Sequence, residues 1–130
     1  MIDPGRLAQL PCFAELTDEE RARVADLLKE KNVAADEGVA IQGDFAYEFF
    51  VIDDGTAEVR ENGRRVAEIG PGDFFGELGL LVTGRRTATV VATSPMTLFV
   101  LFDQDFRRLE HELPHFAQAL RETMSDRFHR

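Results

Sequence analysis

The hydrophobic positions of the chain follow two different periods. Over residues 1–31 they recur every three or four positions, which is typical of amphipathic helices. Over residues 32–103 they fall in short runs separated by glycine-containing turns, which is typical of an antiparallel barrel or roll. Over residues 104–130 the helical period returns. The pattern predicts one domain over residues 1–130, a mainly β, α+β fold in which an antiparallel, jelly-roll-like β-roll is flanked by helices.

Two helical segments are predicted before the roll. The first is about one turn within residues 6–13, which we expect Pro11 to end. The second runs from about residue 18 to 31 and begins at a capping box, in which Thr17 and Glu20 each accept a hydrogen bond from the other's backbone N–H. Their apolar sides are formed by Leu7, Leu10 and Phe13, and by Val24, Leu27 and Leu28.

The central region predicts short strands at 33–35, 39–42, 48–54, 56–61, 64–69, 86–93 and 97–103. The clearest turn is Asn62-Gly63, a pair that suits a tight hairpin because both residues tolerate positive φ. We therefore expect the two strands beside this turn to pair. Alternation along them gives four candidates for the inner face, Ala57, Val59, Val66 and Ile69.

Two helical segments are expected after the roll. The first runs from about residue 103 or 104 to Glu112, and the second begins at Pro114, a residue favoured in a first helical turn. On the second segment an apolar stripe recurs every four residues at Phe116, Leu120, Met124 and Phe128. Such a stripe must cover another apolar surface.

Composition narrows the class of protein. A chain of 130 residues that is 44% hydrophobic suits one domain, and eleven Phe with no Trp predict a core of Phe, Leu and Val. The single cysteine, Cys12, excludes an intrachain disulfide and is expected to be a buried small hydrophobe. No run approaches the roughly 20 apolar residues that span a bilayer, and no signal-peptide pattern is present, so we expect a cytoplasmic location.

The net charge of −9 disfavours nucleic acid and anionic membrane as partners, because both attract basic surfaces. An anionic ligand would have to be held by local positive charge. Arg85 and Arg86 supply such charge at the head of a β-branched strand. We expect Arg86 to be the ligand-binding member of the pair and Arg85 to be solvent-exposed.

The segment from Gly76 to Val90, GELGLLVTGRRTATV, has the features of an anion holder. It predicts a short helix that leads into an Arg-Thr strand, and helix N-termini and guanidinium groups both bind phosphate. Glu77 would repel a simple phosphate, but a carboxylate accepts hydrogen bonds from hydroxyl groups. The combination indicates a nucleotide or a sugar phosphate.

The same segment resembles the phosphate-binding cassette of cyclic-nucleotide-binding domains. The first half of the cassette, which begins with Phe-Gly-Glu and ends with a small residue and Leu-Leu, matches residues 75–81, and Arg-(Thr/Ser/Ala)-Ala-(Thr/Ser)-Val matches residues 86–90. Other matching positions are Gly38, Gly43-Asp44, the strand 50–52, Gly55 and Pro71-Gly72-Asp73. The resemblance covers nearly the whole chain.

The resemblance implies a regulatory sensor domain that binds cAMP, or alternatively cGMP, with no metal. In the family, the Arg pairs with the cyclic phosphate, the Glu accepts from the ribose 2′-OH, and nearby backbone N–H groups support the phosphate. Carried onto this chain, the implied site residues are Gly76, Glu77, Leu78, Gly79, Arg86, Thr87 and Ala88. Thr87 would offer its hydroxyl to the phosphate or the purine.

The resemblance also implies a moving part. The purine in this family lies between the roll and the last helix, so we expect that helix to change position when nucleotide binds. The candidates for the lid contact are Leu120, Met124, Arg127 and Phe128.

An enzyme is the less favoured interpretation. A metal-dependent β-barrel needs several His on strands, whereas His111, His115 and His129 lie in the C-terminal helical region and Pro114 disrupts the spacing of the first two. No arrangement of a nucleophile with a base is recognisable either. We therefore expect neither catalysis nor a metal site.

Two other interpretations stay open. One is a ligand-free β-roll that serves as a protein-interaction module, although the presence of both Glu77 and Arg86 argues against it. The other is a detached regulatory fragment of a channel, transporter, kinase or enzyme. A transcription factor is disfavoured, because no helix-turn-helix follows the last helix. An effector protein or a second copy of the chain remains a possible partner.

Overall fold

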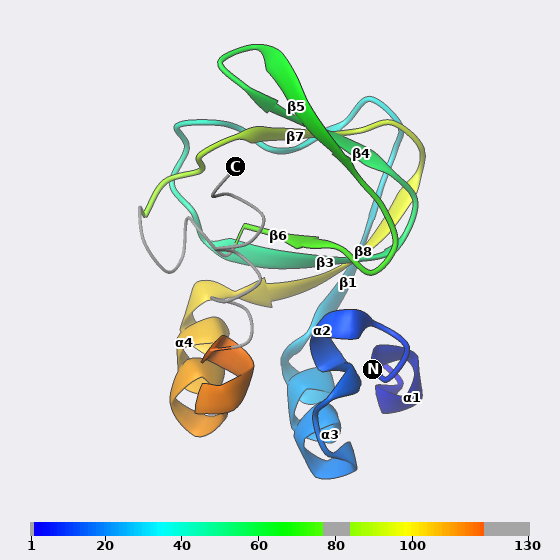
Figure 1. Cartoon of the computed structure of the whole chain (residues 1–130), viewed down its shortest axis with the longest axis vertical. Coiled ribbons are helices and arrows are strands. Elements are labelled where there is room, and N and C mark those ends of the chain that lie inside the picture. Colours follow the sequence, from blue (N-terminus) through cyan, green and yellow to red (C-terminus); the bar gives the residue numbers. More distant parts are fainter. Residues whose placement is uncertain (1, 77–83, 119–130) are drawn as a thin grey trace.

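The chain folds into two antiparallel sheets that face each other, with a layer of short helices outside one of them (Figure 1). The structure is a computed structural model, and it describes residues 2–76 and 84–118. The helices gather beyond the sheet that contains β3 and β8. This arrangement confirms the predicted β-roll with flanking helices.

The strands are β1 (Lys29–Val33), β2 (Gly38–Ala40), β3 (Glu48–Asp54), β4 (Ala57–Glu61), β5 (Arg64–Ile69), β6 (Phe74–Phe75), β7 (Thr89–Ala92) and β8 (Met96–Phe102). One sheet has the order β1-β8-β3-β6 and the other has the order β2-β7-β4-β5. The β4–β5 hairpin turns at Asn62 and Gly63, whose φ angles of 52° and 80° are those that the predicted Asn-Gly turn requires.

The helices are α1 (Pro4–Leu7), α2 (Pro11–Ala14), α3 (Asp18–Leu27) and α4 (Asp103–Glu112), and residues 114–118 are also helical. The predicted capping box begins α3. The Glu20 N–H donates to the Thr17 hydroxyl at 3.1 Å, and the Thr17 N–H donates to the Glu20 carboxylate at 2.9 Å. Two backbone donors that the first helical turn leaves without partners are thereby satisfied.

In the sheet β1-β8-β3-β6, the strands β3 and β8 are buried on both faces and separate two apolar cores. Alternate residues of β3 and β8 pack against the helices, among them Phe49 and Phe99. The residues between them pack against the second sheet, among them Phe50 and Leu98. Burial of both faces explains why these two strands are continuous apolar runs rather than alternating ones.

Two predicted boundaries in the N-terminal part were wrong. The helix expected over residues 18–31 ends at Leu27, and the following residues form β1, which pairs with β8 along its whole length. A ladder with a buried partner strand outweighs weak helical propensity. Pro11 does not end a helix but begins α2, where its missing N–H costs nothing.

The prediction that Val66 lies on the inner face was also wrong. Ala57, Val59 and Ile69 are buried as expected, but the Val66 side chain is 53% exposed. Successive residues of a strand point to opposite faces, so Val66, three positions from Ile69, faces away from it. β5 is moreover the edge strand of its sheet.

Candidate functional site

The structure tests only part of the predicted site. Gly76, Arg86, Thr87 and Ala88 belong to the described residues, whereas Glu77, Leu78 and Gly79 lie outside them. The four lid candidates, Leu120, Met124, Arg127 and Phe128, lie outside them as well. The described part of the expected cassette is therefore the side that contains Arg86.

Arg86 is the one buried charged residue among those that the structure describes, with 8% of its surface exposed. It lies just before β7, which begins at Thr89 rather than at residue 86 as expected. Both backbone groups of Arg86 are bonded to the segment that follows β2. Its N–H donates to the Asp44 carbonyl at 2.8 Å, and its carbonyl accepts from the Gly43 N–H at 2.9 Å.

The guanidinium of Arg86 lies over an aromatic ring. Its Cζ is 5.4 Å from the centroid of the Phe50 ring, and Phe50 stacks in turn on Phe75 with 4.7 Å between ring centroids. Nη1 also donates to the Gly76 carbonyl at 3.4 Å. A cation over a ring face is stabilised by the ring quadrupole, so the apolar core itself helps to orient the charged group.

Residue 76 has to be a glycine because neighbouring atoms of the protein leave no room for a β-carbon. Its φ is +94°, and a β-carbon there would lie 2.6 Å from Arg86 Nη1 and 2.8 Å from the Glu48 carbonyl oxygen. The sequence suggested that Gly76 leaves room for a ligand. In the structure, the glycine also leaves room for Arg86, and the two predicted site residues are brought into contact.

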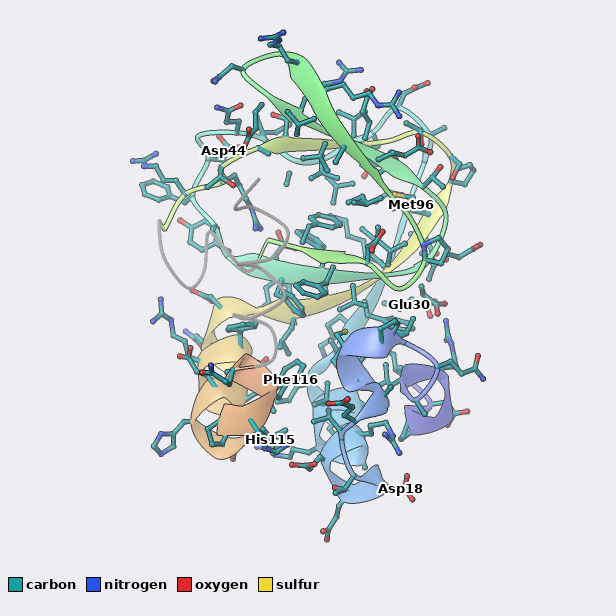
Figure 2. All side chains as sticks on the ribbon, viewed as in Figure 1. Asp18, Glu30, Asp44, Met96, His115 and Phe116 are labelled. Atoms are coloured by element: carbon teal, nitrogen blue, oxygen red, sulfur yellow. The ribbon has the colours of Figure 1, made fainter. Side chains whose placement is uncertain are left out.

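Arg86 lines a cavity of about 500 Å³, a size within the range of small-molecule sites. The other lining residues come from β2, from the loop between β2 and β3, from the first residue of β3 and from Arg85. Figure 2 shows Asp44 of that loop at one end of the roll. The described lining residues are Val39, Ala40, Ile41, Gly43, Asp44, Phe45, Tyr47, Glu48, Arg85 and Arg86.

Arg85 lies on the rim of this cavity. It is exposed, as expected, and its Cζ is 4.1 Å from the centroid of the Phe45 ring, while its Nη1 donates to the Gly43 carbonyl at 2.9 Å. Phe45 and Tyr47, each 57% exposed, were not predicted as part of the site. The signal that marks them is the presence of two aromatic residues in a polar loop.

Thr87 and Ala88 are half-buried and continue the arm from Arg86 into β7. Ala88 packs against the core between the two sheets. Both residues therefore follow Arg86 directly in the chain, and Ala88 faces the apolar core.

The start of the C-terminal helical region is attached to the N-terminal helices (Figure 2). The ring of Phe116 is 3% exposed and stacks on Phe13, with 5.7 Å between ring centroids. Nε2 of His115 lies 3.0 Å from the Glu20 carboxylate, and Arg23 pairs with Glu112 at 3.0 Å. The stripe predicted on this helix thus begins as core packing.

Cys12 and Glu20 in the N-terminal helical part have shifted pKa values. Cys12 is partly buried, rather than buried as expected, and packs against the core under the helices. Desolvation there raises the pKa of its thiol to about 12, which makes it unreactive. The hydrogen bond from the Thr17 N–H lowers the pKa of Glu20, and His115 adds to the effect. No helix of the described residues is long and apolar enough to cross a bilayer.

Comparison with protein families gives a match to the model described as "Cyclic nucleotide-binding domain" over residues 30–112. The regulatory subunit of cAMP-dependent protein kinase from Yarrowia lipolytica is 35% identical over 108 residues, which cover 83% of this chain and 29% of that protein. The chain therefore spans less than a third of this relative.

Solved structures show the same fold. The catabolite activator protein of Thermus thermophilus is similar with a TM-score of 0.82 and 28% identity, covering 92% of this chain and 58% of that one. The cAMP-bound PfPKA-R is similar with a TM-score of 0.78 and 26% identity, covering 92% and 45%.

Proposed function

The chain belongs to the cyclic nucleotide-binding domain family, and from that premise we propose that it binds cAMP as a regulatory sensor. The observation that carries the proposal is the buried guanidinium of Arg86 in the wall of a cavity of about 500 Å³. In a chain with a net charge of −9, this cation offers an anion the local charge that the molecule as a whole does not.

In the proposed complex, Arg86 donates to the cyclic phosphate and backbone N–H groups from Gly76 to Gly79 support it. Glu77 accepts a hydrogen bond from the ribose 2′-OH, and Thr87 donates to the phosphate or the purine. Leu78 and Ala88 complete the lining. An acceptor for the 2′-OH would distinguish a ribonucleotide from a simple phosphate, because a carboxylate repels phosphate but accepts from a hydroxyl. The nucleotide is the ligand, and the proposal needs no metal.

The last helix is proposed as the moving part. The packing of Phe116 on Phe13 supports a fixed hinge at its start, from which the rest of the helix would close over the purine. Leu120, Met124, Arg127 and Phe128 are the proposed contacts. A lid that contacts the ligand in only one state shifts toward that state by its differential affinity. Amide hydrogen exchange of residues 116–128 should therefore slow when cAMP is added.

A regulatory role rather than catalysis fits the relatives, which are regulatory subunits and an activator protein by name. Because the chain matches less than a third of the kinase regulatory subunit, the effector that it controls is not determined by this likeness. We propose that the nucleotide-dependent surface acts on an effector protein, either in trans or within a longer polypeptide. Self-association through the last helix is the second option.

Calorimetric titration with cAMP and with cGMP tests the proposal. Arg86→Ala should weaken binding by at least about tenfold, or about 1.4 kcal/mol. Arg64→Ala removes an equal charge from the exposed hairpin turn, outside the residues that line the cavity, and serves as the matched control. The expected change is less than about twofold because exposed charges contribute little. If the folded wild-type chain binds neither nucleotide, the interaction-module interpretation replaces this one.

A further inference from the structure

Three chain segments around Arg86 are joined by hydrogen bonds of Gln42 and by the pairing of β4 with β7. The Gln42 side chain donates from Nε2 to Asn62 Oδ1 at 2.9 Å, and its Oε1 accepts from the Asn62 N–H at 2.8 Å. The Gln42 backbone N–H donates to the Thr89 hydroxyl at 2.9 Å. Thr89 in turn pairs with Arg60, two residues before Asn62. The ring of contacts is thus complete.

This ring spans the sheet. In the order β2-β7-β4-β5, Gln42 follows β2 at one edge, and Asn62 lies in the turn that joins β4 to β5 at the other edge. β7, which begins at Thr89, lies between β2 and β4. The Gln42–Asn62 pair therefore links the segments on either side of β7, the strand that follows Arg86.

The two residues that follow Gln42 hold Arg86 directly. Gly43 donates to the Arg86 carbonyl and Asp44 accepts from the Arg86 N–H. Beyond them, the Ala46 N–H donates to the Gly84 carbonyl at 3.0 Å. A loop that is anchored at Gln42 thus fixes the backbone from which the guanidinium projects. Neither Gln42 nor Asn62 is among the described residues that line the cavity.

We propose that Gln42 and Asn62 are positioning residues for Arg86, an inference that rests on the proposed role of Arg86 in nucleotide binding. Without the amide pair, the segment that grips Arg86 gains conformational freedom. Part of the binding free energy must then order that segment, and affinity falls without the loss of any ligand contact.

Asn62 is well suited to a selective test. Its φ of 52° favours Asn, Asp or Gly, so Asn62→Gly keeps the turn and removes only the side chain. Asn62→Asp keeps both the turn and an oxygen that can accept from Gln42. Arg64→Ala, an exposed substitution beside the same turn, is the matched control for nonspecific effects on the hairpin.

Calorimetry with cAMP is the first measurement. Asn62→Gly should weaken binding about fivefold, which corresponds to about 1 kcal/mol, the net value of about one hydrogen bond. Asn62→Asp and Arg64→Ala should stay within about twofold of the wild type. In an Arg86→Lys background, the effect of Asn62→Gly should fall below about twofold, because the guanidinium being positioned is gone. An equal loss in both backgrounds would overturn the proposal.

Hydrogen exchange without nucleotide separates this inference from the proposed function. Asn62→Gly should speed exchange of the Gly43 and Arg86 amides, while the Ala92 amide at the far end of β7, which donates to Glu37, keeps its rate. Unchanged exchange at Gly43 and Arg86 would show that the Asn62 side chain does not hold this segment, and would overturn the proposed role of Asn62 whatever the nucleotide affinity. Faster exchange at Gly43 and Arg86 in a chain that binds no cyclic nucleotide would instead support the positioning role of Asn62 and reject the proposed function.

Discussion

Gly76 and Arg86 fit together so closely that a β-carbon on residue 76 would lie 2.6 Å from Arg86 Nη1. Gly76→Ala should therefore displace the guanidinium and also strain the backbone, whose φ is +94°. We expect a loss of about 2 kcal/mol in the free energy of unfolding, measured by urea denaturation.

The control for this substitution is Gly63→Ala. Gly63 has a φ of +80° but no atom within 4 Å of a β-carbon, so its substitution carries the backbone strain without the clash. We expect it to cost about 1 kcal/mol. If both variants lose the same free energy of unfolding, Arg86 moves aside freely, and the close contact between residues 76 and 86 does not affect stability.

The stacking of Phe116 on Phe13 predicts that the C-terminal helical region contributes to stability even without ligand. Phe116→Ala removes a ring that is 3% exposed and should cost about 3 kcal/mol. Phe102→Ala, which removes a ring that is 44% exposed, should cost less than about 1 kcal/mol. Chemical denaturation of the three proteins compares them. Similar stability of Phe116→Ala and the wild type would place the helix outside the cooperative unit.

The raised pKa of Cys12, about 12, predicts a loss of stability at alkaline pH. Above the usual thiol pKa of about 8.5, the unfolded chain ionises while the folded chain keeps its proton. The free energy of unfolding should therefore fall as pH rises from about 8.5 toward 12, by at most about 1.4 kcal/mol per pH unit. Because other groups also titrate there, the readout is the difference between the wild type and Cys12→Ala. A difference independent of pH would show that the thiolate is solvated in the folded state.

The lowered pKa of Glu20 predicts the opposite dependence in acid. The hydrogen bond from the Thr17 N–H stabilises the carboxylate, so its contribution is present above the unfolded pKa of about 4.3 and is lost as pH falls through the lower folded value. The wild type should exceed Glu20→Gln in stability at pH 7, and the difference should shrink as pH falls below the unfolded pKa of Glu20. Thermal unfolding across this range measures the difference, and parallel curves would contradict the prediction.

Sequence reasoning singled out Arg86, whose motif spacing and local charge both distinguish it in an acidic chain, and the structure buries this residue in the wall of a cavity. Sequence reasoning also placed the Asn62-Gly63 turn and the start of α3, because these features depend on neighbouring residues alone. Local chemistry of this kind is readable from one sequence.

The features that it missed depend on partners far along the chain. The end of α3 is set by the pairing of β1 with β8, some seventy residues later. The grip of Gly43 and Asp44 on Arg86 is made by backbone groups, which every residue type possesses. The motif singled out Gly43-Asp44, but it did not reveal that their backbone groups bond to Arg86, because a backbone contact does not depend on residue type.

Phe49 and Phe50 lie on opposite faces of β3, so this strand separates two apolar cores. Phe49 belongs to the cluster under the helices and Phe50 to the cluster beneath Arg86, and among the described residues no side chain is a member of both. Substitutions under the helices can therefore accumulate without altering the composition of the core beneath Arg86. The helical surface and the cavity wall can thus change independently of each other during evolution.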